Sequence, residues 1–232
     1  MVTSRTARAS ACVGTLLPLL LCLPAAGADT ITFTATISTT DIPAEGLLGS
    51  VPIQQFDPAG GRVLQDIDLQ LVTDFAGVMC FENTDPDSAT TFELSLAWSI
   101  ELRRPDESLL IDLDALRSVR GLVDAFDGVV DFGGFSGATF YTSVGDVTGL
   151  FASPTAADIA LFTGSGVLEL PIVATYEGGA AAGSSTSFET DFRDVTFAGE
   201  LTVTYTYVPE PACWALLALG LPALRRWGRV CA

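Results

Sequence analysis

The chain has 232 residues, with 28 acidic side chains, 11 basic ones, no histidine and a formal net charge of −17. The stretch from residue 29 to residue 207 holds six of the basic residues and 27 of the acidic ones, so its own net charge is −21. That charge excludes nucleic acid and anionic lipid as partners. The lack of histidine excludes Ser-His-Asp catalysis, Cys-His catalysis and histidine zinc sites.

The first 28 residues have the parts of a secretory signal peptide in the usual order. Arg5 and Arg8 supply the positive start, and an apolar core follows over residues 11–23. Ala26 and Ala28 flank a glycine and form the small-x-small cleavage site. The apolar run is shorter than the roughly 20 residues that span a bilayer. We therefore predict export by the Sec machinery and Asp29 as the first residue of the mature protein.

Residues 29–207 alternate apolar and polar side chains with a period of two. The clearest runs are ITFTATI (31–37), DIDLQL (66–71), FELSLAWSIEL (92–102) and LTVTYTY (201–207). Such alternation indicates strands with one buried face. Breakers rich in glycine and proline separate the runs. We predict a single all-β domain, an antiparallel β-sandwich of the jelly-roll or immunoglobulin-like type.

Three local features of this domain carry expectations of their own. Residues 106–121 form the one stretch that could be helical, and the pattern there is ambiguous. Cys80 is the only cysteine between residues 29 and 207, so we expect no disulfide inside the domain and a buried thiol. The GFSGA stretch at 134–138 resembles a nucleophile elbow without the final glycine or a base, and we expect a turn.

Calcium is the one cofactor that the sequence suggests. Asp85 and Asp87 flank a proline, and Glu82 and Asn83 precede them, which puts several oxygen ligands on one turn. Hard cations prefer such ligands. The alternative is an acidic loop that water alone solvates, and the D-x-D-x-D-G pattern is absent from the sequence.

The sequence leaves two forms of carbohydrate chemistry open. Trp98, Tyr176 and Tyr205 could line a sugar groove, but their places in the alternating runs favour packing in the core or at its rim. A glycoside hydrolase with two carboxylates is formally open. Nothing in the sequence selects one pair of carboxylates, so we expect no enzyme and name no catalytic residue.

Residues 208–232 form a tail of a different character. Pro209, Glu210 and Pro211 lead into thirteen apolar or small residues, and Arg225 and Arg226 follow them. At about 1.5 Å per residue, a helix of thirteen covers roughly 20 Å, less than the ~30 Å hydrocarbon core of a bilayer. The arginines would stay in the cytoplasm, leaving the domain outside.

This tail resembles the PEP-CTERM sorting signal, in which a Pro-Glu-Pro motif, a short hydrophobic helix and arginines follow one another. The resemblance implies transient insertion of the tail into the inner membrane. It also implies cleavage by an exosortase, a membrane cysteine transpeptidase of Gram-negative bacteria that make exopolysaccharide. The sorting residues would be Pro209, Glu210, Pro211, Arg225 and Arg226.

Residues 51–71 are similar to the opening of choice-of-anchor E domains. The Gln-Phe-Asp-Pro segment at 55–58 and Gly61 match that family, as does the threonine-tyrosine strand just before the tail. The family has no assigned activity. We therefore expect an exported cell-surface or exopolysaccharide-matrix protein with a structural or adhesive role. The alternative is a calcium- or carbohydrate-binding module.

Overall fold

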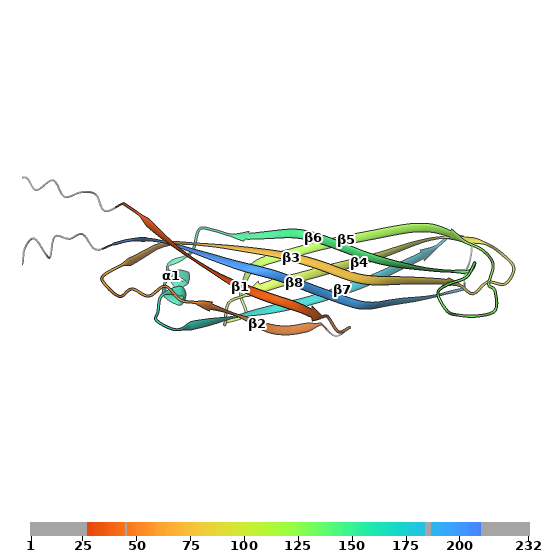
Figure 1. The fold of residues 1–232 in the computed structure, drawn as a ribbon, viewed down its shortest axis with the longest axis horizontal. Coiled ribbons are helices and arrows are strands. Elements are labelled where there is room, and N and C mark those ends of the chain that lie inside the picture. The colour runs from red at the N-terminus through yellow and green to blue at the C-terminus, as the bar shows by residue number, and fades with distance from the viewer. Residues whose placement is uncertain (1–26, 45, 184–186, 210–232) are drawn as a thin grey trace, which may run out of the picture. The chain divides into compact units, whose positions relative to one another are not determined.

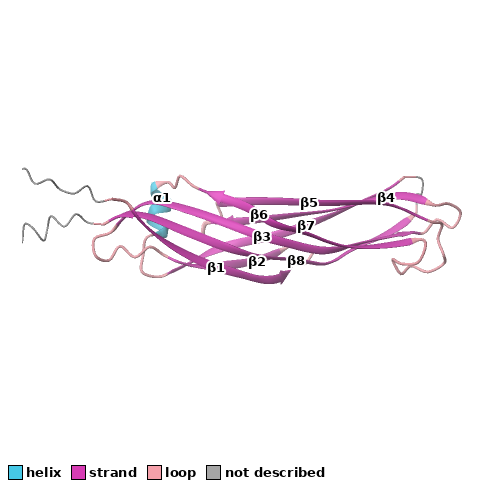
Figure 2. Cartoon of the chain, turned by 45° about the horizontal axis from the view of Figure 1, so that its top comes forward, coloured by secondary structure: helices cyan, strands magenta, loops and turns pink. Residues whose placement is uncertain are grey.

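A computed structural model describes residues 27–44, 46–183 and 187–209, and nearly all of them lie in β-strands (Figure 2). The elements in chain order are β1 (Asp29–Asp41), β2 (Leu47–Gln54), β3 (Val63–Asn83), β4 (Thr90–Arg103), β5 (Leu109–Val123), β6 (Gly137–Phe151), α1 (Ala156–Phe162), β7 (Val167–Ala182) and β8 (Phe188–Val208). The predicted signal peptide up to Ala26 and the tail from Glu210 onward lie outside the described residues.

The strands form two four-stranded sheets, and the predicted antiparallel β-sandwich is confirmed (Figure 1). Sheet A has the strand order β1-β8-β3-β6, and sheet B has the order β2-β7-β4-β5. All paired strands named here run antiparallel. The first four strands thus pair with the last four in reverse order, β1 with β8, β2 with β7, β3 with β6 and β4 with β5.

The core lies between the two sheets, where the inward residues of the alternating runs meet. The six apolar residues at the even-numbered positions of the run at 92–102 are all buried, as the period of two predicts. Trp98 of sheet B packs against Phe75 of sheet A, with ring centroids 5.6 Å apart. Tyr205 is fully buried and donates a 2.9 Å hydrogen bond to the carbonyl of Gln54. Burial raises the pKa of this phenol, so it stays protonated as a donor.

The ambiguous stretch at 106–121 is not helical but belongs mainly to β5. Every residue from Ile111 to Val123 is in register with a partner on β4, and inward Leu113 and Ala115 alternate with outward Asp112 and Asp114. The helix α1 was not predicted. Its signal was the capping box of Thr155 and Asp158, in which each side chain bonds the other's backbone N–H.

The two ends of the described body lie together. Asp29 pairs with Tyr207, and Val208 pairs with Val63, so both ends of the body emerge at what we call the proximal end. Strands β3 and β8 have 21 residues each, or about 70 Å at 3.3 Å per residue. The β3–β4 and β5–β6 loops, the end of β7 and the start of β8 lie at the opposite, distal end (Figure 1).

Candidate functional site

Glu82, the first of the predicted calcium ligands, is a fully buried carboxylate at the distal end of β3. It accepts a 2.7 Å hydrogen bond from the N–H of Phe132 and a 2.5 Å bond from the hydroxyl of Ser136. The same hydroxyl oxygen accepts a 3.3 Å bond from the N–H of Asp127. A buried carboxylate is costly unless it is hydrogen-bonded. Here its bonds order the loop between β5 and β6.

Asn83 follows on β3 and ties that loop to the β3–β4 loop. Its amide nitrogen donates 2.8 Å bonds to the carbonyls of Ser88 and Asp124, one in each loop. Its amide oxygen accepts a 3.1 Å bond from the N–H of Asp85. All three polar functions of this buried side chain therefore have protein partners.

Asp85 and Asp87 lie on the β3–β4 loop itself. One carboxylate oxygen of Asp85 accepts from the N–H of Asp87 and the other from the hydroxyl of Ser88, both at 2.9 Å. These two bonds, with that from Asp87 the larger cause, lower the pKa of Asp85. Over the described ranges, no group of three or more acidic, cysteine or histidine side chains is placed to hold a metal ion. Calcium binding at these four residues stays a prediction.

The expected turn is confirmed for residues 134–136, where Gly134 has a φ of +64°, whereas residues 137 and 138 begin β6. Ser136 within it is fully buried, and its hydroxyl is committed to Glu82. The serine therefore acts as a structural donor that holds the turn against β3.

The outer face of sheet B carries two hollows that follow β4. One has a volume of about 610 Å³ and the other about 460 Å³. Because the even-numbered residues of β4 face the core, the odd-numbered ones form the outer floor: Thr91, Glu93, Ser95, Ala97 and Ser99. We call this floor, with its flanks on β5 and β7, the outer trough. The two hollows lie in it one after the other.

The register sets the walls of the outer trough. Ala97 lies between Leu116 of β5 and Glu177 of β7, and Ser99 lies between Asp114 and Thr175. Five floor residues at alternate positions span about 27 Å, and two strand spacings give a width of about 10 Å. Four of the five floor side chains are small, and the β7 wall is low at Gly179 and Ala181, which leaves room for an extended polymer chain.

One ion pair crosses the floor of the trough. Arg120 of β5 donates to Glu93 of β4 at 2.9 Å, and the arginine side chain is 76% exposed. This hydrogen bond from the guanidinium, with the carboxylate's charge, raises the pKa of Arg120. The pair presents both a cation and an anion to whatever lies in the trough.

The three aromatic residues considered for sugar stacking do not offer their rings to the trough. Trp98 and Tyr205 are fully buried, and Tyr176 is half-buried against the core. The expectation of core or rim packing is confirmed. The trough could not be predicted from the sequence, because its residues are brought into line only by pairing between distant strands.

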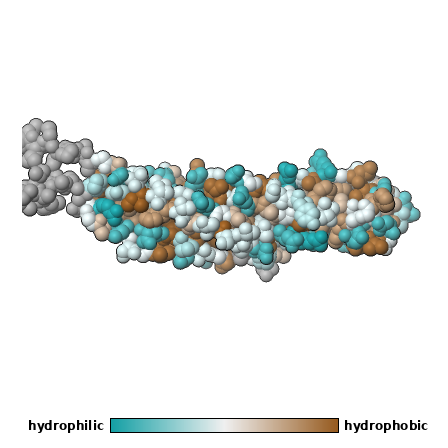
Figure 3. All heavy atoms as spheres, viewed as in Figure 1, coloured by the Kyte–Doolittle hydropathy of each residue, from teal (hydrophilic) through white to brown (hydrophobic). Residues whose placement is uncertain are grey.

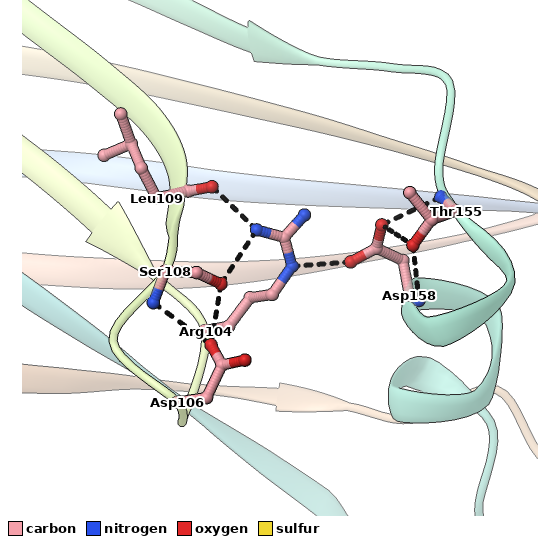
Figure 4. A network of polar contacts seen from close by, with 6 residues as sticks. All are labelled: Arg104, Asp106, Ser108, Leu109, Thr155 and Asp158. Atoms are coloured by element: carbon pink, nitrogen blue, oxygen red, sulfur yellow. Dashed lines mark hydrogen bonds and ion pairs between the residues drawn. The ribbon is translucent and has the colours of Figure 1, made fainter.

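A second polar network lies on the proximal side of the sandwich (Figure 4). Arg104, in the β4–β5 turn, donates from Nε to Asp158 Oδ1 at 2.6 Å. Its Nη1 donates to the hydroxyl of Ser108 at 3.1 Å and to the carbonyl of Leu109 at 2.7 Å. The Arg104 guanidinium also lies 5.6 Å from the ring centre of Phe151. The network joins the β4–β5 turn to helix α1.

Asp158 serves both this ion pair and the cap of α1. Its other oxygen accepts 2.8 Å bonds from the N–H and the hydroxyl of Thr155. Burial alone would raise the pKa of this carboxyl, but hydrogen bonds from Arg104 and Thr155 outweigh burial and lower it. The ionised carboxylate is therefore the form that the fold holds.

The Gln-Phe-Asp-Pro segment at residues 55–58 packs against the same helix. Phe56 is buried, and its N–H donates to the carbonyl of Phe162 at 2.8 Å. The Gln55 side chain donates to the carbonyl of Leu161, also at 2.8 Å. These contacts give the segment a structural role, because they attach it to helix α1.

Of the predicted sorting and cleavage residues, the structure describes two. Ala28 is exposed before β1, and Pro209 follows the last residue of β8. Ala26, Glu210, Pro211, Arg225 and Arg226 lie outside the described residues. In the part of the chain that is described, no helix has the length and apolar character needed to cross a membrane.

Comparison with known proteins gives no family. No family model matches the chain, and no curated protein matches it. A chain in the structure of infectious bursal disease virus Gx strain is 13% identical, with a TM-score of 0.21, over 81% of this chain and 42% of that one. The VP2 subviral particle of the same virus is 11% identical, with a TM-score of 0.18, over 87% of this chain and 50% of that one. The chain thus spans half or less of these structures, and TM-scores this low carry no argument about it.

Proposed function

We propose that this chain is an exported cell-surface or exopolysaccharide-matrix protein with a structural or adhesive role. Residues 1–28 direct its export, and residues 208–232 are the substrate of an exosortase-type membrane transpeptidase. The observation that carries the proposal is the pairing of Asp29 with Tyr207. The predicted new N-terminus and the predicted sorting tail join the body side by side, while the distal loops lie about 70 Å away.

The place where β8 ends supports the same proposal. Pairing with β3 continues to Val208, and Pro209 follows at once. Proline lacks an amide donor and biases the residue before it away from helix. A protease that cuts near Pro209–Pro211 would therefore remove the tail without removing a paired residue of the sheet.

The intact mass of the protein from its native cells tests the proposal. We expect an N-terminus at Asp29 and a C-terminus within residues 209–211. The double variant Arg225→Ala, Arg226→Ala should accumulate with its tail attached, whereas Arg117→Ala, a matched loss of an exposed arginine in the body, should be processed normally. A mature protein that still ends at Ala232 would contradict processing.

The strand order supports the jelly-roll form of the sandwich over the immunoglobulin-like form. In immunoglobulin-like sandwiches the first strand pairs with the second. Here β1 pairs with β8, and the four nested pairs are those of one long hairpin folded over itself. Jelly rolls have eight strands in two sheets of this kind.

The outer trough favours carbohydrate binding as a second candidate function. Its length suits several units of an extended chain, and Asp114, Glu177 and Glu93 along it disfavour an anionic polymer. A neutral or amino-bearing linear polysaccharide fits best. Binding of the full chain to a glycan array should be lost in Ala97→Leu, which fills the floor, and kept in Gln70→Leu on the outer face of sheet A. Equal binding by both variants would exclude the trough.

A further inference from the structure

Among the strands that the structure describes, both sheets have an unpaired edge in the distal half of the sandwich. Strand β1 ends at Asp41, opposite Thr196 of β8, and β2 begins at Leu47, opposite Ala174 of β7. Beyond those points β7 and β8 continue toward the distal loops with a strand neighbour on one side only (Figure 1). Unpaired backbone N–H and C=O groups on such an edge are a template for another strand.

The open edge of β8 is protected against strand addition. It carries four charged residues in six positions, Glu189, Asp191, Arg193 and Asp194. The register with β3 also shifts between Ala76 and Val78, and Asp194 beside the shift has a φ of +50°. Charges and bulges are the usual means of blocking an edge.

The last five residues of the open edge of β7, beyond Glu177, have neither protection. The residues from Gly178 to Ala182 are Gly-Gly-Ala-Ala-Ala, without charge or proline. Their register with β4 is unbroken. Gly178, Ala180 and Ala181 are exposed. A Cβ at Gly178 would lie 2.4 Å from the ring of Phe192, so this position has no room for a side chain. These five residues therefore form a regular edge without large or charged side chains.

We propose that a second copy of this chain pairs with this edge. The two β7 strands run antiparallel about a two-fold axis at Ala180, and the two B sheets become one sheet of eight strands. In this register Gly178 of one copy faces Ala182 of the other, Gly179 faces Ala181, and Glu177 faces Gly183. Small residues meet small residues, and no like charges lie directly opposite, as a self-complementary two-fold contact requires.

The neighbouring strands leave this register free. Strand β2 covers β7 only as far as Ala174, so no strand in the described part of the chain pairs with the five residues from Gly178 onward on that side. Paired residues of an antiparallel ladder point to the same face. The outer troughs of the two copies would therefore lie on one face of the joined sheet, which doubles the surface open to a polymer.

Charge decides both the choice of edge and the conditions for pairing. Each body carries a net charge of −21, so two copies repel one another at long range. Of the two open edges, the uncharged segment of β7 is the one where they can meet without placing carboxylates opposite each other. Because salt screens long-range repulsion, the association should strengthen as ionic strength rises.

Sedimentation of the full chain in detergent tests the proposal, since detergent keeps the apolar ends from driving association. We expect a reversible dimer whose dissociation constant falls with added salt. Ala181→Lys should raise that constant at least about tenfold, because a lysine on the edge blocks strand addition. Gln70→Lys makes the same charge change on β3, which is paired on both sides. This variant should leave the dissociation constant within about twofold of the parent value.

Cysteine cross-linking supplies a second readout. Ala180→Cys places two thiols opposite each other at the axis and should form a disulfide-linked dimer under mild oxidation. Gln70→Cys, on the same background of five native cysteines, should form no more disulfide-linked dimer than the unmodified chain does. A monomer at every concentration, or equal behaviour of the two lysine variants, would overturn the proposal. Sorting of the tail could still hold in that case, because the mass experiment reads it separately.

Discussion

Arg104 Nε lies 2.6 Å from Asp158 Oδ1, and this contact joins a turn of sheet B to the cap of the only helix in the described residues. The Asp158 side chain is 2% exposed and that of Arg104 is 20% exposed. The pair therefore differs from the surface ion pair of Arg120 and Glu93. The difference in burial sets different expectations for their removal.

Arg104→Met should destabilise the fold by about 2–3 kcal/mol, because it leaves a buried carboxylate without its cation. Arg120→Met, which removes the partner of an exposed pair, should cost less than about 1 kcal/mol. Denaturant unfolding of both variants, compared with the parent chain, measures the two values. Equal losses would mean that the Asp158 charge is solvated in spite of its burial.

The same carboxylate should make stability depend on acid. The folded-state pKa of Asp158 is lowered, so its contribution is fully present above the unfolded-state pKa of about 3.9 and is lost as the pH falls through the folded-state pKa. The difference in unfolding free energy between the parent chain and Asp158→Asn should therefore shrink from pH 6 toward pH 3. A difference that grows in acid would contradict the lowered pKa.

Removing Glu82 should loosen the distal loops. Glu82→Ala leaves the half-buried N–H of Phe132 and the buried hydroxyl of Ser136 without their acceptor, at a cost of about 2–3 kcal/mol. Hydrogen exchange should quicken most in residues 124–136. Asp87→Ala removes an exposed carboxylate from the neighbouring loop and should change that exchange little. Unchanged protection in Glu82→Ala would mean that the loop orders itself.

The strands could be predicted well because the alternation of apolar and polar residues is a local pattern. Six alternating positions in the run at 92–102 were enough to place one face of β4 in the core. Residues 106–121 were ambiguous because only pairing with β4, a tertiary contact, decides between strand and helix there. The partners of Glu82 and Arg104 were out of reach for the same reason: Ser136 and Asp158 are each 54 positions away.

The cluster at 82–87 shows what a ligand pattern in the sequence leaves open. Four oxygen-bearing residues in six positions suggest a cation site when they are considered alone. In the fold, the side chains of Glu82 and Asn83 turn inward and bond to a loop that lies 40 to 50 residues later. Spacing along the chain does not reveal which oxygens are already occupied.

Gly149 of β6 should not tolerate alanine, since the space for a methyl group there is already filled. A Cβ at this position would lie 2.4 Å from Ile111 Cγ2 and 2.9 Å from Leu113 Cδ2, both on β5. These contacts come from the meeting of the two sheets at their β5 and β6 edges, and both neighbours are buried. Overpacking of this kind costs about 1–3 kcal/mol.

Gly49→Ala on β2 is the matched control, because its Cβ would lie 3.5 Å from Ile172 Cγ2, an ordinary contact. Neither glycine has a positive φ, so backbone strain does not separate the two positions. We expect Gly49→Ala to leave stability unchanged or slightly raised, since alanine restricts the unfolded chain. Thermal unfolding of the two variants decides the matter. Equal midpoints would mean that the β5 and β6 edges can move apart by the width of a methyl group at little cost.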